Sequence, residues 1–167
     1  MTSLRAPRDE DVPALAVLRN DLPTQYALLA TPQPNTLDDV RAWIRRRTSD
    51  KAALFYVIAD ETDAAIGFTQ VVAIDEYARH GMFGIAIDER HRGRGHARAA
   101  IEALCAETLA GGRLDKLVLH VAADHPVACA LYRSAGFSDV GVLRRHYREP
   151  GGWHDVAIME RFLVPLA

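Results

Sequence analysis

The chain has 167 residues, of which 49% are hydrophobic and 25% charged, with a formal net charge of −2. This length suits one domain with a full core, spanning residues 1–167, and the near-neutral charge gives no support for nucleic-acid binding. No apolar run is long enough to cross a membrane and the first residues lack a signal-peptide pattern, so we expect a cytoplasmic protein without membrane contact.

The first half of the chain reads as helices and strands in turn. The segment 22–34, which contains three prolines, is predicted to be a loop or a broken helix that is free to line a substrate site. In the helix after it, an apolar face formed by Val40, Trp43 and Ile44 continues to Arg47. The predicted elements of this half are strands at 3–6, 54–59 and 66–74, a helix from Asp9 or Asp11 to Asn20, and a helix over 37–48 capped by Asn35 or Thr36.

The second half predicts longer strands and two further helices. Its expected elements are strands at 82–87, 117–121, 137–147 and 153–163 and helices at 97–109 and 126–135. The order β-α-α-β-β-β-α-β-α-β-β predicts an α/β fold, a mixed and mostly antiparallel sheet of about six to seven strands flanked by about four helices. The strand–helix–strand unit at 82–121 is expected to be parallel.

An arginine-rich turn between the 82–87 strand and the next helix favours an anion. Gly93 and Gly95 permit positive φ and close approach of a ligand to the backbone. The free N–H groups at a helix start and the helix dipole attract negative charge. The turn lacks the Lys-Ser/Thr of a Walker loop and the third glycine of the dinucleotide fingerprint. A solvated surface turn is the alternative. The arginines of this stretch are Arg90, Arg92, Arg94 and Arg98.

Two motifs and their spacing point to one family. The turn follows the pattern Arg-x-x-Gly-x-Gly/Ala, and Val121-x-x-x-His125-x-x-Ala128-x-x-Leu131-Tyr132-x-x-x-Gly136-Phe137 lies downstream of it. Together they resemble the GNAT superfamily of N-acetyltransferases over about residues 82–137. The stretch 152–159 is similar to the ribosomal-protein-alanine and phosphinothricin-type branches.

The resemblance implies acetyl-CoA as co-substrate. A backbone N–H near Ile85 would polarise the thioester carbonyl, as in the family. His125 stands where the family has an asparagine that bonds the cofactor arm, and no residue spacing indicates a metal site. The residues expected to bind the coenzyme are Ile85, Ala86, Ile87, Arg92, Gly93, Arg94, Gly95, His96, Ala97, His125 and Ala128.

The resemblance also assigns the proton chemistry. Tyr132 is expected to protonate the CoA thiolate, the alternative being a tyrosine that only packs in the core. Met82 replaces an acidic residue common in the fourth strand, and His120 lies where one branch has a catalytic glutamate. Histidine at this position can act as the base, or it can simply pack on the sheet. Glu76, His80 and a water-mediated base are further alternatives.

These assignments predict acetyl transfer to a primary amine by direct attack in a ternary complex. Cys105 and Cys129 read as core residues in helices, so no acyl-cysteine intermediate is expected. The acceptor is predicted to be a small molecule. The alternatives are a peptide amine or a non-catalytic acyl-CoA sensor on the same fold, and homodimer formation is left open. Four residues around the last hairpin are candidates for shaping the acceptor pocket: His146, Tyr147, Trp153 and His154.

Overall fold

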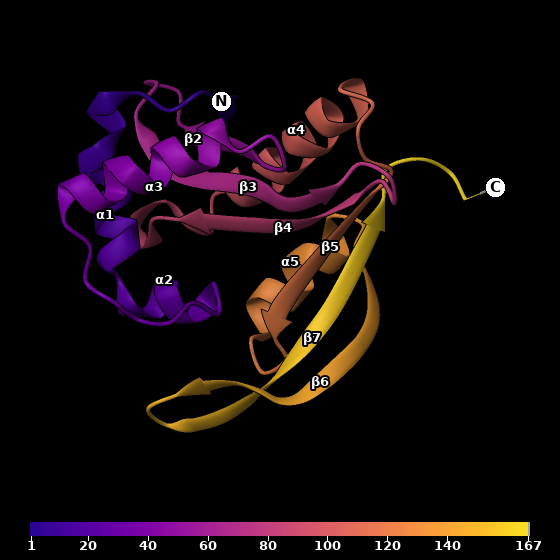
Figure 1. Cartoon of the computed structure of the whole chain (residues 1–167). Helices are drawn as coiled ribbons and strands as arrows, with labels where there is room; N and C mark the ends of the chain where they lie inside the picture. Colours follow the sequence, from indigo (N-terminus) through magenta and orange to yellow (C-terminus); the bar gives the residue numbers. More distant parts are fainter. Residues whose placement is uncertain (167) are drawn as a thin grey trace.

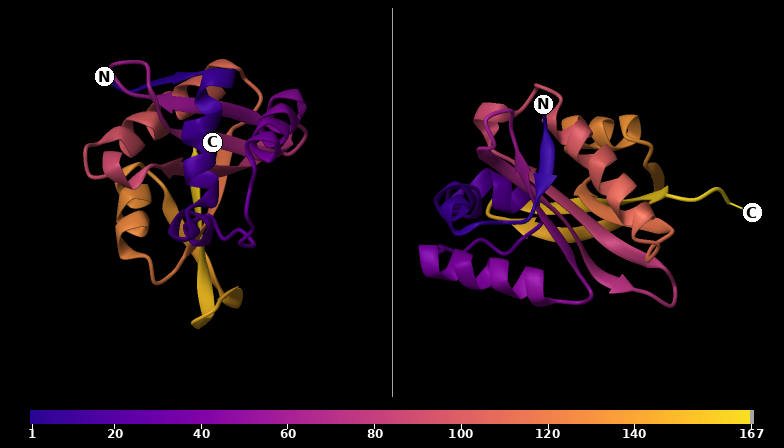
Figure 2. Two further views of the ribbon diagram at one scale, coloured as in Figure 1. Left: turned by 90° about the vertical axis from the view of Figure 1, so that its left-hand side faces the viewer. Right: turned by 90° about the horizontal axis from the view of Figure 1, so that it is seen from above.

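A seven-stranded sheet runs through the molecule and carries helices on both faces (Figures 1 and 2). The structure is a computed structural model that describes residues 1–166. The strands are β1 Ser3–Arg5, β2 Leu54–Ala59, β3 Ala65–Asp75, β4 His80–Ile87, β5 Lys116–Ala122, β6 Ser138–Glu149 and β7 Gly152–Phe162. The helices are α1 Val12–Asn20, α2 Leu22–Ala27, α3 Leu37–Ser49, α4 His96–Ala110 and α5 Pro126–Ser134, with 3-10 turns at Asp9–Asp11 and Glu89–His91.

The sheet order is β1-β2-β3-β4-β5-β7-β6, and β4–β5 is its single parallel pair. This pairing confirms the predicted parallel unit. It covers three residue pairs, from His80 with Lys116 to Met82 with Val118. Beyond these pairs the two strands diverge, and Figure 1 shows them meeting at one end and spreading apart toward the other. The sheet is therefore split over the last part of β4.

Three clusters of buried residues hold the helices against the sheet among residues 1–166. One packs α1 and α3 on β2 and β3, where the Trp43 ring lies 5.0 Å edge-on from both Phe55 and Phe68. A second packs α4 and α5 on β3, β4, β5 and β7, with Leu117 and Leu119 buried in it. The small third cluster places α4 against β2, β3 and the end of β4. Figure 2 shows the two helix pairs on opposite sides of the sheet.

Local capping explains where the N-terminal helices begin. Thr36 caps α3 by accepting from the Asp39 N–H, while the Asp39 carboxylate accepts from the Thr36 N–H. The predicted loop or broken helix at 22–34 contains α2, because the Asp21 carboxylate accepts from the Thr24 N–H and Pro23 occupies the first turn. This short helix brings the number of α-helices to five, one more than expected.

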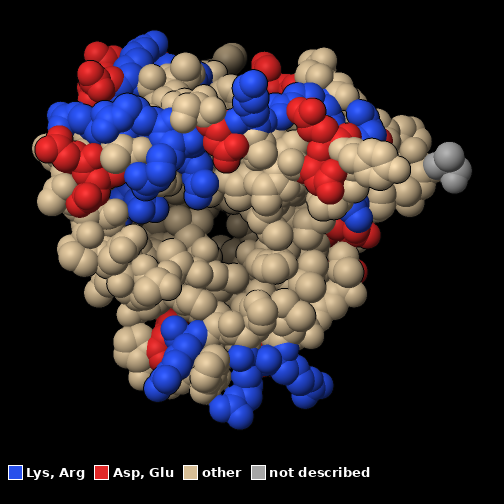
Figure 3. Space-filling model, in the orientation of Figure 1, with Lys and Arg blue, Asp and Glu red and all other residues tan. Residues whose placement is uncertain are grey.

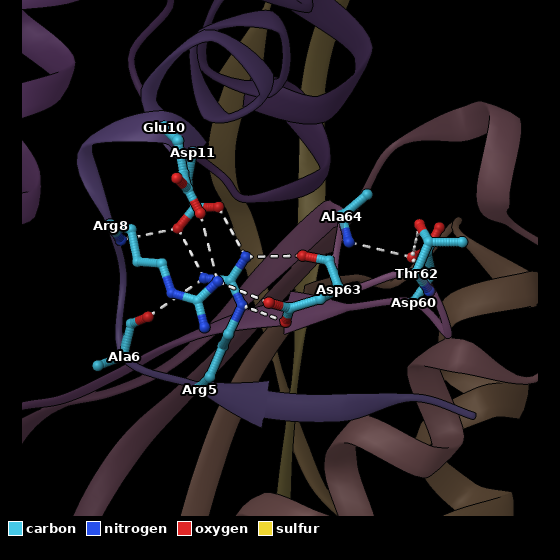
Figure 4. A network of polar contacts seen from close by, with 9 residues as sticks. All are labelled: Arg5, Ala6, Arg8, Glu10, Asp11, Asp60, Thr62, Asp63 and Ala64. Atoms are coloured by element: carbon cyan, nitrogen blue, oxygen red, sulfur yellow. Dashed lines mark hydrogen bonds and ion pairs between the residues drawn. The ribbon is translucent and has the colours of Figure 1, made fainter.

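A polar network fixes the start of α1 (Figure 4). The sequence predicts Asp9 or Asp11 as the N-cap of this helix, and Asp11 takes that position, but its side chain makes no capping hydrogen bond to α1. Its carboxylate instead accepts two hydrogen bonds from the Arg5 guanidinium, each 2.8 Å, and one from the Arg8 N–H at 2.7 Å. Asp63, on the β2–β3 turn, also accepts from Arg5. The network ties β1, α1 and that turn together.

Within residues 1–166 no helix is both long and apolar enough to cross a membrane.

Candidate active site

The arginine-rich turn between β4 and α4, which we call the anion loop, has the backbone conformation that its glycines predicted. Gly93 and Gly95 have φ of +73° and +83°, in the left-handed region that favours glycine. Gly95 is the N-cap of α4, so the first N–H groups of that helix begin at the loop and have no partner within the helix. A Cβ added to either glycine would meet no atom within 4 Å. The glycines are therefore required by backbone conformation, and the space above them is open to a ligand.

Arg92 and Arg90, two arginines of the anion loop, have different hydrogen-bond partners. Arg92 is fixed across the loop, donating from Nε to the Ile87 carbonyl at 2.8 Å and from Nη2 to Thr24 Oγ1 at 3.2 Å. Arg90 instead pairs with Asp88 at 2.6 Å, and this hydrogen bond helps to lower the pKa of Asp88 to about 2. The charge of Arg90 is thus neutralised locally and is less available to an external anion.

A cavity of about 330 Å³ lies over the loop and the end of β4. Thr24, Ala27 and Leu28 close it from the 22–34 segment. Arg94, predicted to bind the coenzyme, is exposed and does not line this coenzyme-side cavity. The other predicted coenzyme residues all line it: Ile85, Ala86, Ile87, Arg92, Gly93, Gly95, His96, Ala97, His125 and Ala128.

The start of α5 uses the predicted cofactor-arm residue as a helix cap. His125 Nδ1 accepts from the Ala128 N–H at 3.2 Å. This bond leaves Nε2 as the ring nitrogen available to a ligand in the coenzyme-side cavity. The histidine thus supplies one of the roles of an asparagine, helix capping, while its ring also borders the cavity.

Tyr132, on α5, lies at the junction of two cavities. Its ring packs edge-on against Phe83 at 6.2 Å and against Phe137 at 5.9 Å between centroids. Burial, and secondarily the nearby Cys129, raise the pKa of Tyr132 to about 12. The phenol therefore holds its proton at neutral pH.

The second cavity, of about 380 Å³, adjoins the coenzyme-side cavity and shares Ala27, Leu28, Ile85 and Tyr132 with it. We refer to it as the acceptor-side cavity. Apolar side chains, among them Trp43, Phe68, Met82 and Phe83, form much of its wall. Figure 3 shows a hollow at the centre of this face, with Lys and Arg side chains gathered over α3 beside it.

His120 lines the acceptor-side cavity and not the coenzyme-side one. Its ring lies 6.3 Å from that of His146 on β6. Burial, followed by the charge of His146, lowers the pKa of His120, so its neutral form dominates at pH 7. The alternative bases lie elsewhere: Glu76 pairs with Arg113 at 2.7 Å, and neither Glu76 nor His80 lines either cavity.

The last hairpin contributes one clear contact to this region. The Tyr147 hydroxyl donates to the Ala30 carbonyl at 2.7 Å, joining β6 to the segment after α2. His154 bonds Asp124 at 2.8 Å, and Trp153 is about half exposed. None of the four hairpin candidates lines the acceptor-side cavity itself.

Sequence reasoning missed three polar residues of this cavity, Arg19, Arg47 and Gln70. Gln70 pairs in register with Gly84, and a Cβ on Gly84 would lie 3.5 Å from Gln70 Nε2, in ordinary contact. The sequence did offer a sign for Arg47, because a charged side chain on the otherwise apolar face of α3 is unusual. No such pattern marks Arg19 or Gln70.

Comparison with known proteins places this site in a family. The model of the acetyltransferase (GNAT) domain matches residues 2–138. Spermidine N(1)-acetyltransferase of Vibrio cholerae is 29% identical over 124 residues, covering 74% of this chain and 72% of that protein. N-alpha-acetyltransferase RimI of Mycobacterium tuberculosis is 42% identical over 67 residues, 40% of each chain. A crystal structure of the Vibrio cholerae spermidine N-acetyltransferase in complex with CoA and spermine superposes with a TM-score of 0.90 at 26% identity, covering 97% of this chain and 95% of that one.

The sheet, the loop and the two joined cavities are those of an acyl-CoA-dependent transferase. The chain belongs to the GNAT acetyltransferase family and is an acetyl-CoA-dependent N-acetyltransferase. The predicted family, fold class, co-substrate and enzyme class are thereby confirmed.

Proposed function

We propose that the protein acetylates a primary amine of a small molecule by direct attack in a ternary complex. One observation carries this proposal: the coenzyme-side and acceptor-side cavities meet at Tyr132 and Ile85. Two reactants held in adjoining cavities are close enough for direct attack, which needs no covalent enzyme intermediate. The proposed coenzyme residues are those predicted from the sequence that line the coenzyme-side cavity.

Each step has a candidate residue. Bound acetyl-CoA supplies the thioester. The neutral amine forms a bond to the carbonyl carbon, the C–S bond breaks, and the amine loses a proton. A backbone N–H near Ile85 stabilises the oxyanion, and Tyr132 gives its proton to the departing thiolate. An alkylamine has a pKa near ~10, so a base is needed at neutral pH.

We assign the base role to His120, acting directly or through a water. Its place in the acceptor-side cavity and its lowered pKa support this assignment. The cysteines support direct attack, because burial raises the pKa of the Cys105 thiol to about 11 and Cys129 is buried against the Ala122 carbonyl. A thiol that stays protonated is a poor nucleophile.

Two considerations favour a small acceptor. The cavity volume of about 380 Å³ suits a metabolite-sized molecule. The relative with the longer match is a spermidine acetyltransferase, whereas the RimI match covers 40% of this chain. A peptide amine is the second candidate, supported by that shorter match. The cytoplasmic location and the homodimer stay predictions.

Thiol release from acetyl-CoA over an amine panel tests the proposal. We expect amine-dependent release, with intersecting initial-velocity lines that indicate a ternary complex. Parallel lines would contradict direct attack. CoA binding by calorimetry with no release for any amine would favour the sensor alternative. Cys129→Ser serves as the control and should keep its turnover.

A further inference from the structure

The acceptor-side cavity contains positive charge that no protein carboxylate balances. Arg19 and Arg47 both line it, whereas no Asp or Glu does. Neither arginine takes part in an ion pair among residues 1–166. Elsewhere among residues 1–166, arginines such as Arg5 and Arg161 form ion pairs, with Asp11 and Glu102 respectively. The acceptor-side cavity therefore holds two guanidinium groups and no carboxylate.

The surrounding side chains hold these two groups in place. The Arg19 guanidinium lies 4.6 Å over the Trp43 ring and donates from Nη2 to Asn35 Oδ1 at 3.1 Å. Arg47 follows Trp43 by one helical turn on α3, on the same face. The Nε atoms of both arginines are buried without a hydrogen-bond partner in the described chain.

Placing the charges of Arg19 and Arg47 in one partly buried cavity is energetically unfavourable unless an anion binds there. Burial, followed by the charges of Arg47 and Arg46, lowers the pKa of Arg19, which means that its charged form is disfavoured where it stands. Like charges in a partly buried cavity repel, and a carboxylate relieves that repulsion with bidentate hydrogen bonds. The unpartnered Gln70 Oε1 in the same cavity can accept from an ammonium or amine.

We propose that the acceptor is a small amine that also bears a carboxylate, an amino-acid-like molecule bound through Arg19 and Arg47. This inference rests on the proposed function, since it assigns the substrate class of the same cavity. The reacting amine occupies the end of the cavity bordered by Tyr132 and His120. A polyamine is disfavoured, because its remaining ammonium groups would meet two guanidinium groups with no carboxylate between them.

Matched acceptor pairs test this inference. Lysine is compared with cadaverine, ornithine with putrescine, and β-alanine with ethylamine, together with spermidine, using thiol release from acetyl-CoA. For at least one pair we expect kcat/KM of the carboxylate-bearing amine to exceed that of its partner by about 10- to 100-fold. The preference should weaken as salt is added.

Arginine variants locate the effect. Arg47→Met should raise KM for the preferred amino acid by about 10- to 100-fold, while KM for acetyl-CoA stays unchanged. Arg47→Lys should recover part of the loss, because the charge remains while the bidentate geometry is lost. Arg45→Met on the same helix is the control, since Arg45 is exposed and lines neither cavity. Arg19→Met is the second variant, checked by circular dichroism because Arg19 packs on Trp43.

The outcomes separate this inference from the proposed function. If spermidine or the decarboxylated amines are the better acceptors, or if Arg47→Met leaves KM for the amino acid unchanged, the carboxylate inference is overturned while acetyl transfer stands. If no amine on the panel is acetylated and CoA still binds, both fail.

Discussion

The two cavities that meet at Tyr132 are built in different ways. The coenzyme-side cavity is made largely by one continuous stretch, 85–98, and by the start of α5, so backbone conformation shapes it. The acceptor-side cavity collects side chains from α1, α3, β3, β4 and β5. A site made of backbone serves any acetyltransferase that uses the same coenzyme. A site made of scattered side chains can change its acceptor without disturbing the coenzyme.

Replacing Tyr132, one of the residues that line both cavities, should have the largest effect. We expect Tyr132→Phe to lower kcat by about 1000-fold, because the thiolate then leaves without a proton donor. The dissociation constant for CoA should change little, since the ring and its packing on Phe83 remain. Stopped-flow turnover and calorimetry measure the two quantities. An unchanged kcat would remove Tyr132 from the mechanism.

A second change should disable the coenzyme side alone. Gly95→Val places a β-branched residue at φ +83° and puts its side chain in the space above the loop, so we expect about 100-fold weaker CoA binding. Acetylpantetheine, which lacks the diphosphate, should lose little affinity. Equal losses for the two ligands would contradict the placement of the diphosphate.

The control for this glycine lies just beyond the other end of α4. Gly112 follows α4, has φ of +63° and also has open space around it, but lines neither cavity. Gly112→Val should therefore carry a similar backbone strain and leave CoA affinity unchanged.

On the acceptor side, His120→Asn should give a smaller loss, about 10-fold in kcat/KM, because water can replace part of a base's role. The pKa of His120 lies below its ordinary value, so protonation of the ring should add a loss of activity in the wild type below about pH 6.5. In the pH–rate profile of His120→Asn, this loss of activity at low pH (the acidic limb) should be absent.

His80→Asn is the matched control, because His80 lies outside both cavities and should keep the wild-type pH profile. A pH–rate profile with saturating acetyl-CoA makes this comparison. Persistence of the acidic limb in His120→Asn would assign it to another group.

A change remote from both cavities should affect stability and leave turnover almost unchanged. Asp11→Ala removes a carboxylate that is 3% exposed and paired with Arg5, so we expect the free energy of unfolding to fall by about 3 kcal/mol. Although burial alone raises it, the hydrogen bonds from Arg5 and from the Arg8 N–H lower the pKa of Asp11. Its contribution is thus present above about pH 4 and is lost as the pH falls through the depressed value.

Asp63→Ala is the comparison for this variant. Asp63 accepts from the same arginine but is about half exposed, so the loss should be below about 1 kcal/mol. Urea unfolding at neutral and acidic pH measures both variants. Equal losses would show that burial does not decide the strength of this network.

The same contrast explains what the sequence could predict. The loop glycines, the α4 start and the 121–137 motif are local patterns, and the residues predicted from them, except Arg94, line one cavity. That these residues bind the coenzyme stays a prediction. The order of helices and strands along the chain followed from periodicity. Arg19 and Gln70 escaped prediction because they are brought together by strand register and by the packing of α1 against α3, which no local pattern encodes. Asp11 occupies the predicted N-cap position, but its carboxylate accepts hydrogen bonds from Arg5 and the Arg8 N–H and makes none to α1.

The short contact between β4 and β5 has a thermodynamic consequence. Three residue pairs between β4 and β5 join the four-stranded part of the sheet to the three-stranded part. A pantetheine arm that pairs with the free edge of β4 would bridge the two parts of the sheet. Coenzyme binding would then also hold these two parts together. At 100 times its dissociation constant, a ligand of the native state adds about 2.7 kcal/mol to stability. The coenzyme supply of the cell would then set how firmly the two halves hold together.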